Sequence, residues 1–512
     1  MFNLPRPPGW IGPAGALLLQ ACLLGPNYVE PEIQTADAWR SAVADEMNQE
    51  SPAIVRWWES LGDTVLTDLI RRAELANFDL KSAVARVQEA RAQRGIARGD
   101  YFPTITLDGA YSYFKLSENS PAGQQIVAGG ATIEADDNWQ ASADFFWEID
   151  VFGRIRRQNE AANAQFQASI EDYRDVLVTL YAEVAASYVD VRTYQTRLAF
   201  ARQNADLQRS TVQLTRDRFD AGLVSGLDVA QAETNLAATE SEIPALETAL
   251  QRALNRVAVL LGAQPGTLHD DLADGTGIPT PPDSIAVGLP AELLRRRPDV
   301  RRAERLLAAQ TALIGAAKAD LLPRFSLTGI LELFAPNVGD LFTSESVGWS
   351  LVPGMRWNIF SGGKIRNNVK VQEARTEQLL YFYEQSVLLA LEETENALVA
   401  FELEKLRRDR LTDAVASAER SVAIVRTQYL SGLTDFQRYL DSERALFQQQ
   451  DLLAASEGQV VRNLIALNKA LGGGWSLDGE QPDRSAINAS AGGASAGSPG
   501  TPDNDRQPRY EP

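Results

Sequence analysis

Two very long stretches without glycine or proline constrain this chain more than any other feature. They cover residues 154–221 and 364–431. Because glycine and proline are the residues that most strongly interrupt helices, each stretch can form one continuous helix, roughly 100 Å long at about 1.5 Å per residue. Apolar side chains recur every three or four positions in the first stretch, a spacing that predicts a coiled-coil seam. They include Phe166, Ile170, Tyr173, Leu177, Leu180, Val184, Tyr188 and Val191.

A glycine follows each of these stretches, and a second helical segment begins shortly after it. Gly222 and Gly432 occupy the two positions. Glycine is common where a helix ends, because it adopts the left-handed conformation that lets the chain reverse direction. We therefore expect two antiparallel helical hairpins, over residues 154–262 and 364–472.

The two hairpins belong to an internal duplication. The segment WEIDVFGRIR at 147–156 matches WNIFSGGKIR at 357–366, a shift of 210 positions, and the same shift aligns the two segments around Gly222 and Gly432. Self-similarity at a fixed shift indicates a repeated structural unit. The sequence thus predicts a two-fold structural repeat, with one copy in residues 22–262 and the other in residues 291–475.

Each repeat also carries two stretches in which apolar and polar residues alternate. These stretches cover residues 104–114, 138–150, 325–334 and 348–360. A period of two is typical of β-strands with one apolar face. Their length suits strands that cross a membrane at a tilt, and aromatic residues near the strand ends resemble the girdles found at membrane interfaces. The aromatic residues expected at the interface are Tyr111, Trp139, Trp147, Trp349 and Trp357.

Four strands cannot close a barrel by themselves. An open sheet edge is not tolerated in hydrocarbon, and bacterial barrels begin at about 8 strands. If the apolar faces contact lipid, several copies of the chain must share one barrel, and three copies would supply twelve strands. A half-buried sheet on a soluble core would show the same alternation, so the pattern by itself leaves that alternative open.

The N-terminal residues include the only cysteine of the chain. Residues 1–21 combine Arg6, an apolar stretch and a small residue at the end, a pattern typical of a secretory signal peptide. The segment from Leu19 to Cys22 resembles a bacterial lipobox, in which the cysteine becomes the lipidated first residue after cleavage. We expect lipidation of Cys22. Gln20 is unusual inside such a motif, and an ordinary signal peptide is the alternative.

Composition argues against several classes of function. With one cysteine and one histidine (His269), the chain lacks the usual ligands of a zinc or iron site, so we expect no metal and no cofactor. The formal net charge of −19 disfavours nucleic acid as a partner, because binding to phosphate backbones requires lysine and arginine. The sequence contains no phosphate-binding loop, nucleophile elbow or histidine dyad, and we expect no enzymatic activity.

Five segments resemble one known family in both order and spacing. They are GPNYVEPE after Cys22, WWESLGDTVLTDLI at 57–70, the run at 289–329, NIFSGGKIR at 358–366 and YLDSERALFQQQ at 439–450. The chain resembles the TolC-like outer-membrane factors from about Cys22 to Trp475. The similarity is to their NodT/OprM-like lipoprotein branch, which serves resistance-nodulation-division (RND) efflux systems.

The resemblance implies an α+β membrane protein that assembles as a homotrimer. Four strands per chain would form a twelve-stranded β-barrel in the outer membrane, and the coiled-coil hairpins would continue it as an α-helical barrel in the periplasm. Residues 263–290 would lie in an equatorial belt between the repeats. Residues 476–512 are rich in Gly, Ser, Pro and Asp, a composition that predicts a disordered tail.

The implied function is that of a passive exit duct for drugs and other toxic small molecules. Its implied partners are outer-membrane lipids, a periplasmic adaptor protein and an inner-membrane RND transporter. A channel for type I protein secretion is the nearest alternative. A lipid-anchored periplasmic coiled-coil scaffold without a pore is an alternative from another class.

The resemblance also implies roles for residues at the hairpin turns. Gly222 with Leu223, and Gly432 with Leu433, match turn motifs that accept the adaptor. Alternatively, the two glycines are present only because each ends a helix in the left-handed conformation.

A second implied site is a periplasmic gate. Asp441 matches a position at which the family places a ring of carboxylates, and such rings bind cations and repel anions. Asp228 lies near the corresponding turn of the first repeat. Arg438 is a departure from the pattern, since an arginine that pairs with Asp441 or Asp228 would weaken the preference for cations.

Overall fold

The computed structural model describes residues 23–33, 39, 54–273, 277–282, 290 and 296–476. The expected signal peptide, Cys22 and residues 477–512 of the expected tail lie outside this range. The chain divides into two compact units. The first consists of residues 1–38, 85–175 and 290–393, and the second of residues 39–84, 176–289 and 394–512.

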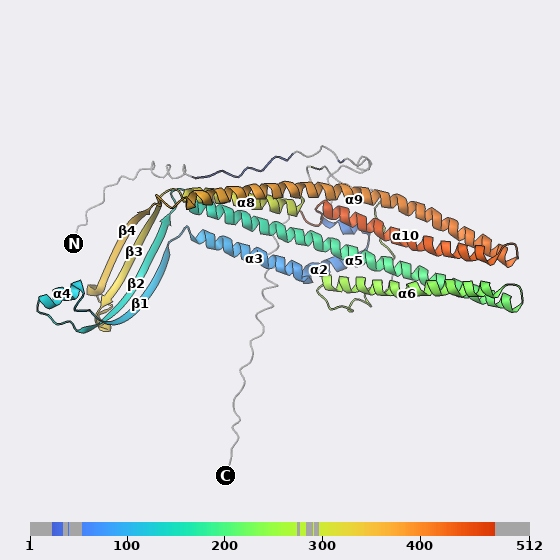
Figure 1. The fold of residues 1–512 in the computed structure, drawn as a ribbon, viewed down its shortest axis with the longest axis horizontal. Coiled ribbons are helices and arrows are strands. Elements are labelled where there is room, and N and C mark those ends of the chain that lie inside the picture. The colour runs from blue at the N-terminus through green and yellow to red at the C-terminus, as the bar shows by residue number, and fades with distance from the viewer. Residues whose placement is uncertain are drawn as a thin grey trace, which may run out of the picture. The chain divides into compact units, whose positions relative to one another are not determined.

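A four-stranded antiparallel sheet with the order β1-β2-β3-β4 belongs to the first unit (Figure 1). Its strands are β1 (Thr104–Lys115), β2 (Ala135–Ile149), β3 (Arg324–Ala335) and β4 (Val347–Arg356). Helix α4 (Pro121–Ala128) lies between β1 and β2, and the short 3-10 helices η4 (Val338–Asp340) and η5 (Ser344–Ser346) lie between β3 and β4. Within the described residues, β1 and β4 each pair with only one strand.

Two strand ends differ from the prediction by more than one residue. β4 ends at Arg356 rather than at residue 360. Its partner β3 begins at Arg324, which pairs with Arg356, so residues after 356 have no partner on β3. Trp357 therefore lies just beyond the strand. β2 begins at Ala135 rather than at residue 138, because β1 continues to Lys115 and pairs with it there.

The register gives the sheet one apolar face and one polar face. Leu107, Ala143, Leu331 and Trp349 form a row across the four strands, and the next row consists of Asp108, Ser142, Glu332 and Gly348. Because neighbouring residues of a strand point to opposite faces, the two rows lie on opposite sides of the sheet. Leu107 is 83% exposed and Trp349 is 75% exposed. The described part of the chain thus leaves much of this apolar face uncovered.

The first described residues are fixed to helices of the same unit, α5 (Arg154–Asp220) and α8 (Pro298–Ala319). The buried Arg157 donates hydrogen bonds to the Leu24 carbonyl oxygen at 3.0 Å and to Asn27 Oδ1 at 2.8 Å. Gly25 has a φ of 86°, and a Cβ atom added there would lie 2.5 Å from Gly315 Cα. Only glycine fits this close approach of two backbones.

Two long helical hairpins have their turns in the second unit, while α5 and α9 begin in the first (Figure 1). One consists of α5 and α6 (Gly226–Leu260), and the other of α9 (Lys364–Leu430) and α10 (Phe436–Ala470). Helices α5 and α9 each contain 67 residues, and α6 and α10 each contain 35. The long helices end one residue before the predicted ends, and the matching lengths agree with the shift of 210 positions.

The second unit also contains shorter elements, which the sequence analysis did not assign. They are η3 (Ile54–Leu61), α2 (Thr64–Ala76) and the start of α3 (Phe78–Gly99). Asp63 caps α2 by accepting hydrogen bonds from the backbone N–H groups of Val65 and Leu66. It also accepts a hydrogen bond of 2.6 Å from the hydroxyl of the buried Tyr188 on α5. One carboxylate thereby joins the start of α2 to the long helix.

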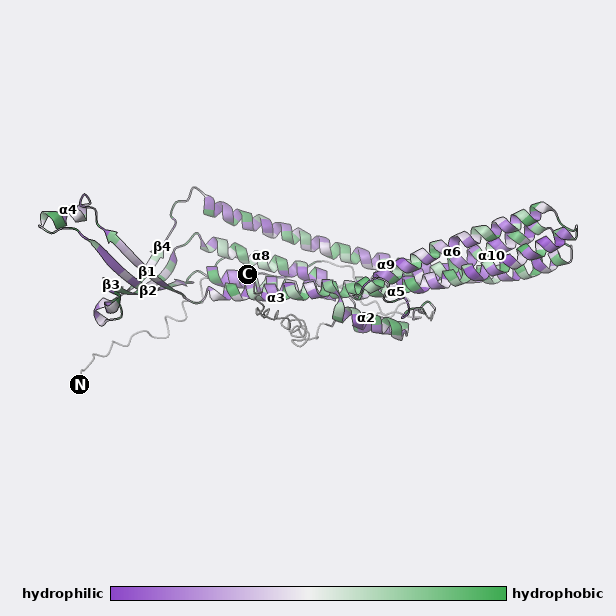
Figure 2. Ribbon diagram, turned by 90° about the horizontal axis from the view of Figure 1, so that it is seen from below, coloured by the Kyte–Doolittle hydropathy of each residue, from purple (hydrophilic) through white to green (hydrophobic). Residues whose placement is uncertain are grey.

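The long helices mix hydrophilic and hydrophobic residues along their whole length (Figure 2). Within the described residues, no helix combines the length and the apolar character needed to cross a membrane.

Candidate functional site

The two hairpin turns have the same backbone geometry. Gly222 and Gly432 have φ angles of 71° and 73°. In the first turn, Gly222 N–H donates to the Phe219 carbonyl and Leu223 N–H donates to the Arg218 carbonyl, both at 2.8 Å. The equivalent hydrogen bonds occur at Gly432 and Leu433 in the second turn. This is the Schellman arrangement, in which the left-handed glycine allows the last carbonyls of the helix to be paired.

Both turns present an exposed leucine directly after the glycine. Leu223 is 67% exposed and Leu433 is 79% exposed. A Cβ atom at either glycine would have no other atom within 4 Å, so the surroundings are open. Each turn thus presents one apolar side chain on a fixed backbone.

The residues expected at the gate begin helices α6 and α10. Asp228 accepts a hydrogen bond of 3.1 Å from Ser225 N–H at the start of α6. At the start of α10, Asp435 accepts one of 2.9 Å from Arg438 N–H, and its carboxylate lies 3.8 Å from the Arg438 guanidinium. Among the described residues, the ion pair of Arg438 is with Asp435 rather than with Asp441 or Asp228. Its charge lies beside Asp435, because that residue is one helical turn away and already fixed as the cap.

Asp441 instead interacts with neighbours on its own helix. Gln437 Nε2 donates a hydrogen bond of 3.0 Å to Asp441 Oδ1, and the Arg444 guanidinium lies 3.8 Å from the same oxygen. The Asp441 side chain is 59% exposed. Its carboxylate is therefore available to a solvent-exposed surface and is only weakly neutralised.

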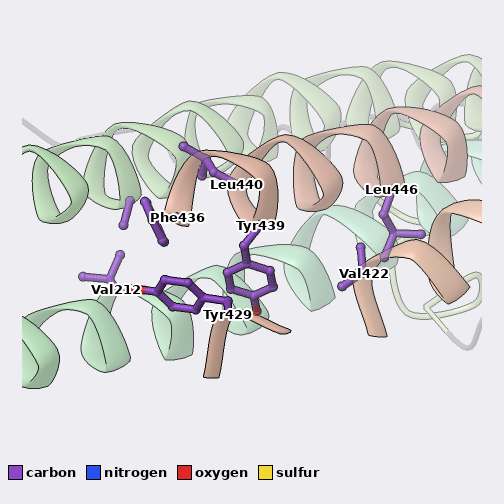
Figure 3. Packing of buried hydrophobic residues seen from close by; sticks show 8 residues of the cluster. Val212, Val422, Tyr429, Phe436, Tyr439, Leu440 and Leu446 are labelled. Atoms are coloured by element: carbon purple, nitrogen blue, oxygen red, sulfur yellow. The ribbon is translucent and has the colours of Figure 1, made fainter. Parts of the chain in front are cut away.

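A cluster of aromatic and aliphatic side chains supports the turns from inside the second unit (Figure 3). The rings of Tyr429 and Tyr439 stack with centroids 5.6 Å apart and an interplanar angle of 15°, and Phe436 lies against both rings. Arg218 of α5 lies 4.7 Å above the Tyr429 ring and donates a hydrogen bond to its backbone carbonyl. The end of α5 is thus attached to the end of α9.

Aromatic residues occupy both ends of the sheet. Tyr111 and Trp139 lie opposite each other near the β1–β2 connection, with ring centroids 4.6 Å apart, and Trp349 lies near the β3–β4 connection. Trp147 is near the other end of β2, and Trp357 follows the other end of β4. Eight residues separate Trp139 from Trp147, or about 26 Å at about 3.3 Å per residue.

Trp147 and Trp357 are fixed in the same way. The Trp147 indole N–H donates a hydrogen bond of 3.0 Å to the Tyr101 carbonyl, and the Trp357 indole N–H donates one of 3.0 Å to the Leu321 carbonyl. Each acceptor lies just before the strand that begins the corresponding strand pair. The anchoring of these indoles could not be read from the alternation pattern, because the acceptors are backbone atoms distant in the sequence.

Among the described residues, no cluster of three or more His, Cys, Asp or Glu side chains could hold a metal ion.

Comparisons with known proteins identify the family. The sequence model of the family described as "Outer membrane efflux protein" matches two stretches of the chain, residues 69–263 and 289–473. This chain belongs to the outer membrane efflux protein family. The two matched stretches contain the two hairpins, one in each.

Members of the outer membrane efflux protein family align with nearly the whole chain. Nodulation protein T of Rhizobium leguminosarum bv. trifolii is 30% identical over 463 residues, which is 90% of this chain and 97% of the relative. The toluene efflux pump outer membrane protein TtgC of Pseudomonas putida is 29% identical over 90% of this chain and 94% of the relative. The solved structure of the outer-membrane channel OprN superposes with a TM-score of 0.83 at 35% identity, covering 89% of this chain and all of that chain.

Proposed function

We propose that three copies of this chain form the passive outer-membrane exit duct of a tripartite efflux pump. The observation that carries the proposal is the four-stranded sheet, which has one exposed apolar face and two edges that no described strand covers. It is supported by membership in the outer membrane efflux protein family.

The open edges of the sheet require more than one copy. Unpaired backbone groups at β1 and β4 cannot be left in hydrocarbon, where each would cost several kcal/mol. Joining β4 of one copy to β1 of the next removes both edges, and three copies form a closed barrel of twelve strands. The apolar face would then contact lipid, and the face with Asp108 and Glu332 would line a water-filled lumen.

The positions of the aromatic residues support a membrane-spanning sheet. Tyr111, Trp139 and Trp349 would form one interfacial girdle, and Trp147 and Trp357 the other. The estimated spacing of about 26 Å along β2 agrees with the apolar band of about 25 Å in outer-membrane barrels.

The helical hairpins would continue the duct into the periplasm. Equal lengths of α5 and α9, and of α6 and α10, support an internal two-fold repeat over residues 22–262 and 291–475. Three copies would place six such hairpins around one axis as an α-helical barrel. Residues 263–290 would belong to an equatorial belt, and residues 476–512 would form a disordered tail.

An N-terminal lipid would anchor each copy. Leu23, the residue after Cys22, lies against Gly153 directly beyond the end of β2, where an added Cβ would be 2.7 Å from Leu23 Cδ1. The contacts of Arg157 with Leu24 and Asn27 hold the following residues. Lipidation of Cys22, after removal of residues 1–21 as a signal peptide, would therefore place acyl chains near the start of the membrane-spanning strands.

The hairpin turns would accept the partners of the duct. A periplasmic adaptor would contact Gly222, Leu223, Gly432 and Leu433 and connect the duct to an inner-membrane RND transporter, which would supply the energy. The exported compounds would be small molecules such as drugs and toxic compounds, a class supported by the name of the toluene efflux relative.

Asp441, Asp228 and Arg438 would lie at the periplasmic gate. Three copies of Asp441 would form a ring of carboxylates that binds cations and repels anions. Because Arg438 lies beside Asp435, and Arg444 only 3.8 Å from Asp441, the ring would be partly but not fully neutralised.

The proposal can be tested in a strain that lacks this chain. The strain should accumulate more dye and antibiotic than its parent, and the wild-type chain should restore export. Asp441→Ala should still assemble but should leak ions across reconstituted bilayers. Asp413→Ala is the matched control, since Asp413 lies on α9 with a 76% exposed side chain and pairs only loosely with Arg410 at 3.7 Å.

The oligomeric state supplies an independent measurement. Light scattering of the detergent-purified protein should give the mass of three chains, and the assembly should dissociate on heating in denaturing gels. A monodisperse monomer in water without detergent, or unchanged dye accumulation on deletion, would contradict the proposed duct.

A further inference from the structure

Five buried polar side chains line the contact between α5 and α10. Asn204 Nδ2 donates a hydrogen bond of 2.8 Å to Gln450 Oε1, and Thr211 Oγ1 donates one of 2.8 Å to Glu443 Oε1. Gln208 lies between Asn204 and Thr211 on the same face of α5. The helices run antiparallel here, so these side chains follow one continuous seam. All five are at most 8% exposed.

Glu443 is the only ionisable residue among these five. It is 1% exposed, and its Oε2 atom has no hydrogen-bond partner among the described residues. Burial raises the pKa of the Glu443 carboxyl above its usual value, while hydrogen bonding with Thr211 and Tyr439 and the charge of Arg426 act in the opposite direction. No ion pair of Glu443 with a cation compensates the buried charge within the described residues.

The equivalent residue of the first repeat is an exposed glutamate with an ion-pair partner. Glu233 is related to Glu443 by the shift of 210 positions. Its side chain is 47% exposed and forms an ion pair of 2.5 Å with Arg216 on α5. Only the second-repeat glutamate is buried.

Gln208 supplies a second acceptor without a partner. Its Oε1 atom is buried and forms no hydrogen bond with any described residue. Two acceptors cannot bond to each other, but a protonated carboxyl group carries a donor. A proton on Glu443 therefore removes a buried charge and adds a donor to a seam in which Gln208 Oε1 lacks one.

Other charged groups near the seam have partners or lie outside it. From α5 and α6, Arg216 and Glu233 pair with each other, and Arg209 pairs with Asp206 and Glu240. From α9, Arg426 is exposed and Tyr429 stacks on Tyr439.

On α10 itself, Arg444 donates to Asn235 Oδ1 and lies near Asp441. Burial raises the pKa of Tyr439 to about 12, so this phenol stays neutral near physiological pH. Glu443 is thus the group of the seam whose charge can change as the periplasm acidifies.

We propose that Glu443 acts as a proton-sensitive lock between α5 and α10, which holds the two hairpins together when it carries a proton and weakens their contact when it is ionised. The folded-state pKa of Glu443 lies above that of the unfolded chain. Its contribution to the contact is therefore fully present at low pH and is lost as the pH rises through the folded-state pKa. The consequence for transport rests on the proposed function: the turn end of the duct would close more firmly in acid.

Hydrogen exchange of the full-length protein in detergent tests the lock directly. After correction for the pH dependence of intrinsic exchange, peptides covering 204–216 and 436–450 should lose protection as the pH rises above the usual pKa of a glutamate carboxyl. The expected loss is roughly fivefold, the factor that corresponds to about 1 kcal/mol for a buried acceptor left unpaired. Glu443→Gln keeps the shape and is always neutral, so its protection should stay high at every pH.

Glu233→Gln is the matched control and should keep the pH dependence of the wild type. Thr211→Val provides a second variant should Glu443→Gln fail to fold. It removes a hydrogen bond that favours the ionised carboxylate, so the loss of protection should move to higher pH. Equal pH dependence in wild type and Glu443→Gln, or a shift to lower pH in Thr211→Val, would overturn the lock. If protection from exchange depends on pH as expected but the protein has no channel activity, the result would support the lock and reject the duct.

Discussion

Gly458 offers a sharp test of how closely α5 and α10 pack. It lies inside α10, where alanine is the better helix former by about 1 kcal/mol. A Cβ atom at this position would lie 2.0 Å from Thr193 Oγ1 on α5 and 3.0 Å from Thr193 Cβ and Cγ2. Rotating the threonine cannot move its Cβ, so the helices themselves must separate.

Overpacking of this kind costs about 1–3 kcal/mol. Because the separation would disturb neighbouring contacts along two long helices, we expect the cost to exceed the gain in helix propensity. Gly458→Ala should therefore destabilise the protein by about 1–2 kcal/mol. The measurement is the thermal unfolding midpoint of the detergent-purified protein, followed by circular dichroism at the helix signal.

Two further variants separate packing from propensity. Gly95 lies inside α3 with no atom within 4 Å of an added Cβ, so Gly95→Ala should be stabilising, by about 0.5–1 kcal/mol. Adding Thr193→Ala to Gly458→Ala removes Thr193 Oγ1 and Cγ2 but keeps its Cβ at 3.0 Å, so it should restore part of the loss. A Gly458→Ala protein at least as stable as the wild type would refute the close packing of α5 on α10.

Other predictions follow from backbone geometry and capping. Gly222→Ala and Gly432→Ala should each lower the free energy of unfolding by about 1–2 kcal/mol in the same thermal assay. The space around both glycines is open, but alanine is strained at positive φ. Asparagine at either position should cost less. Asp63→Ala should cost about 2 kcal/mol, since it removes the cap of α2 and the acceptor of the Tyr188 hydroxyl. Asp63→Asn keeps an acceptor and should recover part of this; equal unfolding midpoints for the two substitutions would contradict the capping role.

Much of the candidate site follows from local patterns. The glycines at 222 and 432 were predicted to end helices in the left-handed conformation, and their positive φ angles confirm this. Alternation of residue types predicted four strands, but not where they end. The end of β4 depends on where β3 begins, and only the pairing fixes that.

Side-chain partners were harder to predict. The resemblance left Asp441 and Asp228 open as partners for Arg438, but the cap at Asp435 holds the arginine on its own first turn. Glu443 and Glu233 occupy equivalent positions in the two repeats, and no local pattern distinguishes them. Their burial differs because the two hairpins pack differently around them.

The sequence by itself determined the long helices, the turns between them, the alternating strands and the duplicated order of these elements, because each depends on residues close together along the chain. The tertiary structure decided that the Glu443 carboxylate is buried, that the Trp147 and Trp357 indoles bond to backbone carbonyls, and that α5 packs closely against α10 at Gly458. Those outcomes depend on atoms that lie far apart in the sequence and meet only after the elements have packed.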